Sequence, residues 1–248
     1  MSLTIEMLFP EIANLHGDNA NIGYLAQCRP DARVVRTGLT DVPAFASGKV
    51  DLVYLGAMTE QGQLKAVERL RPHRARIEEL IAAGSSFLFT HNALEVLGTR
   101  ISNKEMDYDE AGVGVFDLES TVSMFGRYNG KVMGSAPEAG DHPVLGYKSQ
   151  FSMVSAATSI APFITAERGI GRNRGTAREG VRLNNFIGTS LIGPILVNNP
   201  HFTRDLLARL DPNSEPVLAH ESFALAAYES RLEGFRDDRR WHAHERVT

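Results

Sequence analysis

The sequence predicts an α/β fold around a mainly parallel sheet, and three observations support this prediction. Strand-like and helix-like segments alternate through the first 98 residues, as in parallel sheets joined by right-handed helical crossovers. The segment 50–55 (VDLVYL) is apolar enough to be covered on both faces. The chain has 248 residues, 43% of them hydrophobic, and no repeat or low-complexity linker divides it. We therefore expect one domain covering residues 1–248.

The first half of the chain has a clear signal for each element. Segment 3–8 is a short apolar strand that ends before Pro10. A helix over 23–27 should follow, then strands at 32–36 and 50–55. Apolar residues at helical spacing predict a helix over 61–83, interrupted at Pro72 and capped by Gly84. A strand at 86–89 and a helix at 92–97 complete the alternation.

After Gly98 the pattern changes to short β-prone pieces separated by Gly, Asn and Pro. We predict strands at 114–119, 121–125, 131–133 and 151–154, forming a mostly antiparallel extension of the same sheet. Segment 167–182, rich in Gly and Arg, is expected to be a loop, and 202–210 and 222–232 are expected to be helices.

Composition excludes several classes of protein. The net charge of −4 gives no global attraction to nucleic acid or to anionic lipid. The longest apolar runs are interrupted by Gly and Pro and fall short of the about 20 residues that a membrane span needs. The single cysteine, Cys28, excludes an intramolecular disulfide and is expected to be an ordinary packed or surface thiol. We expect a cytoplasmic protein.

Five separated segments then point to one family. They read LFPEIANLHGDNANI (8–22), VYLGAMTEQGQ (53–63), THNALEVLG (90–98), GVGVFDLEST (112–121) and the stretch 169–200. In this order they resemble the cobyric-acid-synthase-like branch of the class I glutamine amidotransferases. The member closest in size is the free-standing amidotransferase subunit of lipid II isoglutaminyl synthase. The resemblance implies a flavodoxin-like, three-layer class I amidotransferase fold with a mixed, mainly parallel sheet.

The same resemblance indicates that the catalytic pair has been replaced. Family members read CGGYQLLG where this chain reads HNALEVLG, so His91 occupies the position of the cysteine nucleophile and Asn92 that of a glycine. They read GTYLHGPLL where this chain reads GTSLIGPIL, so Ile192 stands at the catalytic histidine. Such an enzyme needs a thiolate and a base within about 3 Å of each other. Neither His91 nor Ile192 supplies this chemistry.

The loop that binds the oxyanion in the family is altered as well. Its GGGQD-like run appears here as LGAMTEQ, which keeps Gly56 and replaces glycines by Ala57 and Met58. Backbone amides in this loop could still point into the site, although the Met58 side chain would crowd a glutamine. Gln150, in GYKSQFS, stands where related enzymes have a GYEIH-like strand. The candidate ligand-binding positions are therefore Gly56, Ala57, Thr90, His91, Asn92 and Gln150.

These replacements favour a pseudo-amidotransferase that keeps the fold without hydrolysing glutamine by the Cys-His route. The resemblance implies an ATP-dependent, Mur-ligase-like partner and no cofactor. One alternative is an enzyme that has adapted the pocket, with His91 and Thr90 or the arginine-rich loop, to another small molecule. Another is a glutamine-dependent role through water or an external nucleophile. His91 itself is either a residue that fills the vacated turn or an anion-binding group or base.

Three further features have an ordinary and a functional interpretation. Asp18 or Asn19 is expected to cap the first helix, the alternative for Asp18 being a ligand contact. The five arginines at 168, 172, 174, 178 and 182 are expected to face water, the alternative being a phosphate, a carboxylate or an acidic partner. His242 and His244 lie two residues apart near the C-terminus, and we expect no metal there or elsewhere.

Overall fold

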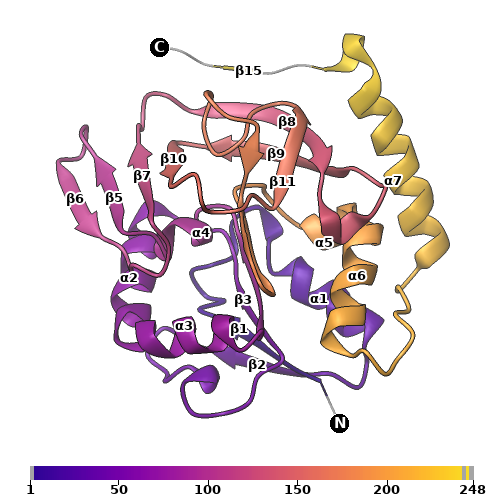
Figure 1. The fold of residues 1–248 in the computed structure, drawn as a ribbon, viewed down its shortest axis with the longest axis horizontal. Helices are drawn as coiled ribbons and strands as arrows, with labels where there is room; N and C mark the ends of the chain where they lie inside the picture. Colours follow the sequence, from indigo (N-terminus) through magenta and orange to yellow (C-terminus); the bar gives the residue numbers. More distant parts are fainter. Residues whose placement is uncertain (1–2, 242–243, 246–248) are drawn as a thin grey trace.

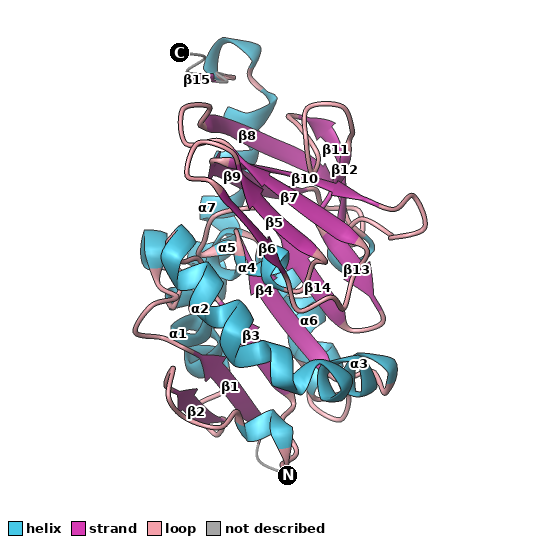
Figure 2. Ribbon diagram, turned by 90° about the vertical axis from the view of Figure 1, so that its left-hand side faces the viewer, coloured by secondary structure: helices cyan, strands magenta, loops and turns pink. Residues whose placement is uncertain are grey.

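A computed structural model describes residues 3–241 and 244–245. Its centre is a six-stranded sheet in the order β13-β14-β4-β3-β1-β2, which runs through the lower half of Figure 2. The bounds are β1 (Thr4–Leu8), β2 (Arg33–Thr37), β3 (Leu52–Leu55), β4 (Ser86–Thr90), β13 (Val181–Leu183) and β14 (Phe186–Thr189). All neighbours are parallel except β13, which is antiparallel to β14. The predicted mixed, mainly parallel α/β sheet is confirmed.

Helices cover both faces of this sheet (Figure 1). Helices α2 (Glu60–Leu70) and α3 (Arg74–Ala82) lie on one face, and α1 (Ala20–Cys28) and α6 (Pro200–Leu210) lie on the other. Alternate side chains of β3 enter the two cores: Val53 packs with residues of α2 and α3, and Leu52 with residues of α1 and α6. Side chains alternate across a strand, so a central strand must be apolar throughout.

The long helix predicted at 61–83 is confirmed, including its interruption. Thr59 caps α2 by accepting a hydrogen bond from the Gly62 amide at 3.1 Å. A short 3-10 turn, Arg71–His73, contains Pro72 and separates α2 from α3, because proline cannot donate the backbone hydrogen bond that a continuous helix needs. Gly84 follows α3 with φ +82°, a conformation that favours glycine.

The region from Thr99 to Glu179 does not extend the central sheet, so the predicted extension is wrong. It forms a four-stranded sheet in the order β10-β7-β5-β6 and a five-stranded sheet that contains β12, β11, β8 and β15, with β9 paired to β8. The strands are β5 (Arg100–Asn103), β6 (Tyr108–Ala111), β7 (Leu118–Val122), β8 (Tyr128–Ser135), β9 (Val144–Gln150), β10 (Ser152–Ala156), β11 (Ile164–Arg168), β12 (Arg178–Glu179) and β15 (His244–Glu245). Strands β5 and β7 pair in parallel, so this region is not uniformly antiparallel.

The strands predicted at 114–119 and 121–125 are replaced by the single strand β7. Residues 113–116 instead bond to the chain just after β4: the amides of Val113 and Val115 donate to the carbonyls of Val96 and Leu97. Their β propensity is therefore overridden by a tertiary contact that satisfies the same backbone groups.

The arginine-rich segment is also not the solvated loop that we predicted, because it contributes to three strands. Arg172 is buried, and its guanidinium donates to the carbonyls of Gly180 and Ile160 at 2.7 and 3.0 Å. Arg178 donates to the Ile160 carbonyl at 2.6 Å. Arg168 bonds the carbonyls of residues 235 and 236 and stacks on Trp241 at 4.2 Å. These guanidinium groups satisfy backbone carbonyls, so their contacts do not favour a phosphate site.

Helix α7 (Glu221–Arg236) extends beyond the predicted 222–232 and lies on the right-hand side of Figure 1. Its residues Tyr228, Leu232 and Phe235 pack on Met133 of β8 and Leu145 of β9. The short helices α4 (Ala93–Val96) and α5 (Ile195–Asn198) follow β4 and β14. Within the part of the chain that the structure describes, no helix is long and apolar enough to cross a membrane.

Candidate functional site

The site positions lie at the carboxyl edge of the central sheet. Segments that follow β1, β3, β4 and β14 meet there, and β1 lies between β2 and β3, where the strand order reverses. Ligands of open α/β sheets bind outside the carboxyl ends of the strands at such a reversal. The topology therefore brings Gly56, Ala57, Thr90, His91 and Asn92 to one edge.

His91 lies on a strained turn between β4 and α4. Its φ is +54°, which is uncommon for a residue with a side chain and is often found at functional sites. The side chain is buried, with Nε2 at 3.0 Å from the carbonyl oxygen of Ser149. Nδ1 is buried and has no hydrogen-bond partner among the described residues. The turn that exposes a nucleophile in other folds is thus present with an imidazole on it.

Ile192 is connected to His91 through strand β9. The Ile192 amide donates to the Tyr147 carbonyl at 2.8 Å, and Ser149, two residues along β9, contacts His91. Ile192 also lines a pocket of about 430 Å³ together with Tyr147, Ser149 and Lys131. An isoleucine cannot take or return a proton at this position.

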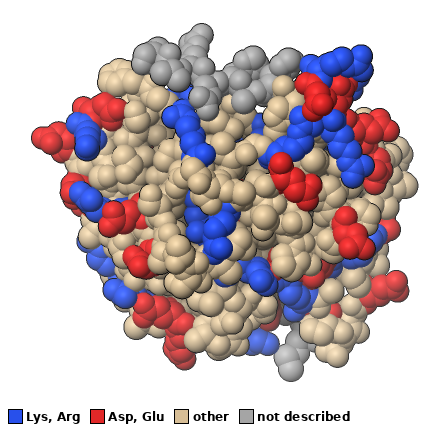
Figure 3. Space-filling view, turned by 45° about the horizontal axis from the view of Figure 1, so that its top comes forward, with Lys and Arg blue, Asp and Glu red and all other residues tan. Residues whose placement is uncertain are grey.

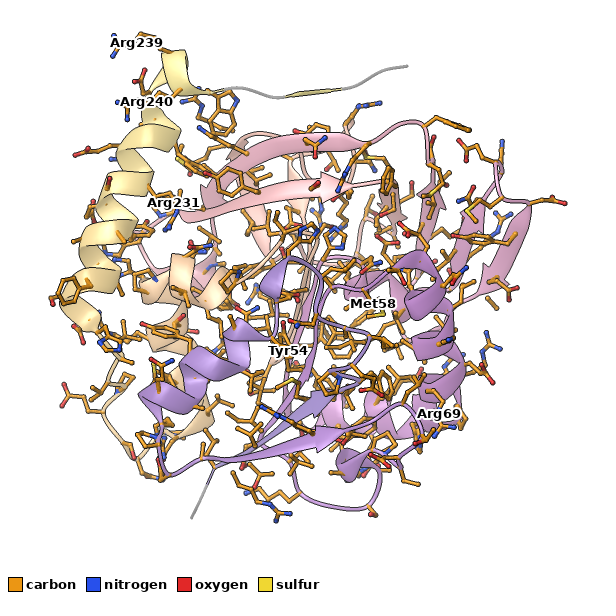
Figure 4. The ribbon with its side chains drawn as sticks, turned by 180° about the vertical axis from the view of Figure 1, so that it is seen from behind. Tyr54, Met58, Arg69, Arg231, Arg239 and Arg240 are labelled. Atoms are coloured by element: carbon orange, nitrogen blue, oxygen red, sulfur yellow. The ribbon has the colours of Figure 1, made fainter. Side chains whose placement is uncertain are left out.

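The amides of the loop after β3 are occupied by side chains of the protein itself. The Ala57 amide donates to Asp18 Oδ2 at 2.7 Å. The Met58 amide donates to Asn92 Oδ1 at 3.1 Å, and Asn92 Nδ2 donates back to the Met58 carbonyl at 2.9 Å. Tyr54 and Met58 lie near the middle of the molecule in Figure 4. A loop whose amides could have bound a ligand anion is therefore satisfied internally.

Asp18 is the centre of this arrangement, and its predicted role as a helix cap is wrong. The N-cap position of α1 is Asn19, the other residue predicted for it, but its side chain makes no capping bond. The Asp18 carboxylate is buried and accepts from Asn21 Nδ2 at 2.9 Å and from the Thr90 hydroxyl, in addition to Ala57. Burial raises the pKa of Asp18, and the hydrogen bonds from Thr90 and Ala57 oppose that rise.

Two glycines make room for Asp18. A Cβ on Gly193, directly after Ile192, would lie 1.8 Å from Asp18 Oδ1. A Cβ on Gly56 would lie 2.7 Å from the carbonyl oxygen of Ala13 and 3.2 Å from Asp18 Oδ2. The distances of 1.8 Å at Gly193 and 2.7 Å at Gly56 are shorter than any ordinary contact of a Cβ atom. Close packing around the carboxylate therefore requires glycine at both positions.

Other predicted residues contact different parts of the structure. Gln150 is buried and donates to the Ser152 carbonyl at 2.6 Å, which stabilises the turn between β9 and β10. Cys28 lies in the last turn of α1, where its sulfur accepts from the Ala219 amide at 3.2 Å and burial raises the pKa of the thiol. This environment agrees with a packed thiol. His242 and the side chain of His244 lie outside the described residues.

A buried ion pair beneath the site is a feature that sequence reasoning missed. Lys148 Nζ and Glu179 Oε1 lie 3.5 Å apart, and both side chains are fully buried. Glu179 also accepts from the Thr189 hydroxyl and the Ser190 amide at 2.9 and 2.8 Å. Burial lowers the pKa of Lys148, and Glu179 opposes this effect. Through Glu179, the pair holds the end of β14, three residues before Ile192, in place.

Sequence reasoning also missed Tyr54, Asn21 and His16. The Tyr54 hydroxyl donates to the Asp18 carbonyl at 2.8 Å, and the His16 ring lies 5.7 Å from that of His91. The polar run NLHGDNAN was the available signal, because such a run after a buried strand is expected at the ligand-binding edge.

Comparisons with known proteins agree with this fold. No family model matches the chain. It is 24% identical over 210 residues to the GatD subunit of the glutamine-hydrolysing lipid II isoglutaminyl synthase from Staphylococcus aureus, covering 84% of each chain.

Solved structures extend the comparison at the level of fold. PurLQS from Thermotoga maritima matches with a TM-score of 0.55 and 11% identity, covering 94% of this chain and 100% of the other. A glutamine amidotransferase matches with a TM-score of 0.54 and 12% identity, over 83% and 98%. The glutaminase domain of Trypanosoma brucei CTPS with bound acivicin matches with a TM-score of 0.52 and 8% identity, covering 86% of this chain and 95% of the other. The chain is glutamine amidotransferase-like and has the flavodoxin-like fold of these proteins.

Proposed function

We propose that this chain is a single-domain, non-hydrolysing amidotransferase-like protein of the cobyric-acid-synthase-like branch. One observation carries the proposal: the amides of Ala57 and Met58 are bonded to Asp18 and Asn92, at 2.7 and 3.1 Å. Even with a nucleophile at position 91, the tetrahedral intermediate of glutamine hydrolysis would lack the oxyanion donors of the loop after β3. His91 and Ile192 remove the nucleophile and base as well.

The proposed role is that of a cytoplasmic subunit that binds an ATP-dependent, Mur-ligase-like amide-forming enzyme. The similarity to a subunit of lipid II isoglutaminyl synthase supports this choice of partner. Fold similarity alone is a weaker argument than site chemistry. On the face seen in Figure 3, basic and acidic side chains are interspersed along the rim and a short run of basic side chains crosses the middle. Mixed charge of this kind suits a specific protein partner better than a polyanion.

The test combines turnover, binding and partner capture. The purified protein should release no ammonia from glutamine above the rate of a His91→Ala variant, and calorimetry should detect no glutamine binding. Native extract should yield an ATP-dependent ligase with the tagged chain. A His91-dependent release of ammonia would overturn the proposal. Failure to recover any ligase, both with the wild-type chain and with the surface variant His220→Asn, would reject the partner role.

A second candidate is an enzyme or sensor with a changed pocket, and the unpartnered Nδ1 of His91 favours it. Thr90 is unavailable for this role, since it is fully buried and its hydroxyl donates to Asp18. The remaining functional group is the imidazole, beside the pocket lined by Ile192 and Ser149. A small molecule that copurifies with the wild-type chain and is lost from His91→Ala would support this candidate over the partner role.

A further inference from the structure

Two histidines and a glutamate that are not among the candidate site residues lie close together. His142 precedes β9, His201 lies in the first turn of α6, and Glu229 lies in the middle of α7. One ligand-type atom from each side chain lies within 4.8 Å of those of the other two. Three separate elements therefore present two imidazoles and a carboxylate to one point.

The surroundings hold these side chains together. The His142 and His201 rings are stacked at 3.4 Å with an interplanar angle of 2°. Tyr228 packs edge-on against both rings, and its hydroxyl donates to the Pro143 carbonyl at 2.8 Å. This bond fixes the loop that carries His142 to helix α7. Packing around Tyr228 therefore holds the segments that carry His142, His201 and Glu229 beside one another.

One buried ring nitrogen of the cluster lacks a hydrogen-bond partner among the described residues. His201 Nε2 is buried and makes no hydrogen bond to any residue in 3–241 or 244–245. A buried polar atom without a partner is costly, and a bond to a metal would remove that cost. His142 and Glu229 are exposed, so an ion can reach the cluster from solvent.

We propose that His142, His201 and Glu229 form a binding site for a divalent transition-metal ion of the zinc class. Two imidazoles and a carboxylate are a donor set that zinc accepts, with a fourth position left for water. The ring planes are parallel, so capture of an ion at about 2.0–2.1 Å requires the exposed His142 ring to rotate out of the stack. Calcium and magnesium, which prefer oxygen ligands, should not bind.

The bound ion would fasten α7 to the body of the protein. Glu229 is on α7, whereas His201 and His142 belong to α6 and to the loop before β9. Figure 4 shows Arg231, two residues after Glu229, and its guanidinium donates to the Asn198 carbonyl at 3.3 Å. A metal at the cluster would add a further connection between α7 and the rest of the protein.

The experiment is a titration of the metal-stripped full chain with Zn²⁺, followed by calorimetry and thermal unfolding. We expect one ion per chain and, at free zinc about one hundredfold above Kd, a rise in Tm of about 5–10 °C. Co²⁺ should give visible d–d absorption bands. Mg²⁺ and Ca²⁺ should cause neither effect. Because the bands and the stoichiometry do not depend on any activity, this test is independent of the proposed function.

Variants separate a built site from casual binding to surface histidines. His142→Ala and Glu229→Gln, both at exposed side chains, should each weaken zinc binding at least tenfold, whereas His220→Asn should leave it unchanged. If His201→Ala fails to fold, the other two variants still decide the result. Wild-type binding weaker than about 0.1 mM, or affinity unchanged in Glu229→Gln, would overturn the proposal.

Discussion

Restoring the missing catalytic pair should not restore glutamine hydrolysis. The perturbation is the double variant His91→Cys/Ile192→His, which places a thiol on the positive-φ turn and an imidazole at the position of the family histidine. Loss of one oxyanion donor typically lowers kcat by about 10² to 10³. The amides of Ala57 and Met58 are both occupied, at 2.7 and 3.1 Å. Two occupied donors correspond to a loss of about 10⁴ to 10⁶.

Against a median enzyme turnover of about 10 s⁻¹, this loss leaves about 10⁻⁵ to 10⁻³ s⁻¹. The assay is release of ammonia from glutamine, coupled to oxidation of NADH by glutamate dehydrogenase. Thermal unfolding and alkylation of the introduced thiol show that the variant is folded and the thiol reachable.

A third substitution, Asn92→Gly, tests whether freeing a backbone amide raises turnover. It removes the side-chain amide that bonds the Met58 backbone and restores the glycine of the family pattern. We expect it to raise the turnover of the double variant by about 10². A double variant that hydrolyses glutamine at about 0.1 s⁻¹ or faster would refute the argument, because the amides would then be available without this release.

Three further predictions concern buried groups. Burial raises the pKa of Asp18 in the folded protein, so the stability that Asp18 contributes is fully present below the unfolded pKa of about 4 and is lost as pH rises through the folded value. Urea unfolding should therefore show wild type losing stability relative to Asp18→Asn as pH rises above about 4. A difference that does not change with pH would contradict this. Lys148→Met should lower the free energy of unfolding by about 3–5 kcal/mol, because it leaves Glu179 buried without its partner. The double variant Lys148→Met/Glu179→Gln should lose less stability in urea unfolding than the sum of the two single changes. Additive losses would contradict the coupling. Burial raises the pKa of the Cys28 thiol, so this thiol should react with a disulfide reagent within about a minute in 6 M denaturant and far more slowly in buffer. Rapid labelling in buffer would contradict this and would show that α1 opens.

The central sheet and its helices could be predicted from sequence because their signals are local. The apolar spacing of α2 and α3, the break at Pro72 and the turn at Gly84 each depend on a few neighbouring residues. Predictions failed where distant partners override propensity. Residues 113–116 bond to the chain after β4, and Arg172 and Arg178 both donate to the carbonyl of Ile160 in another segment.

The sequence by itself determined that positions 91 and 192 carry His and Ile, because the identity of a side chain decides whether a thiolate or a base exists. It did not determine whether the amides after β3 are free to bind an anion. Their partners, Asp18 and Asn92, lie 39 and 34 residues away from Ala57 and Met58. Only the tertiary structure brings these groups within hydrogen-bond distance, and once a buried amide has a partner it has no donor left for a ligand.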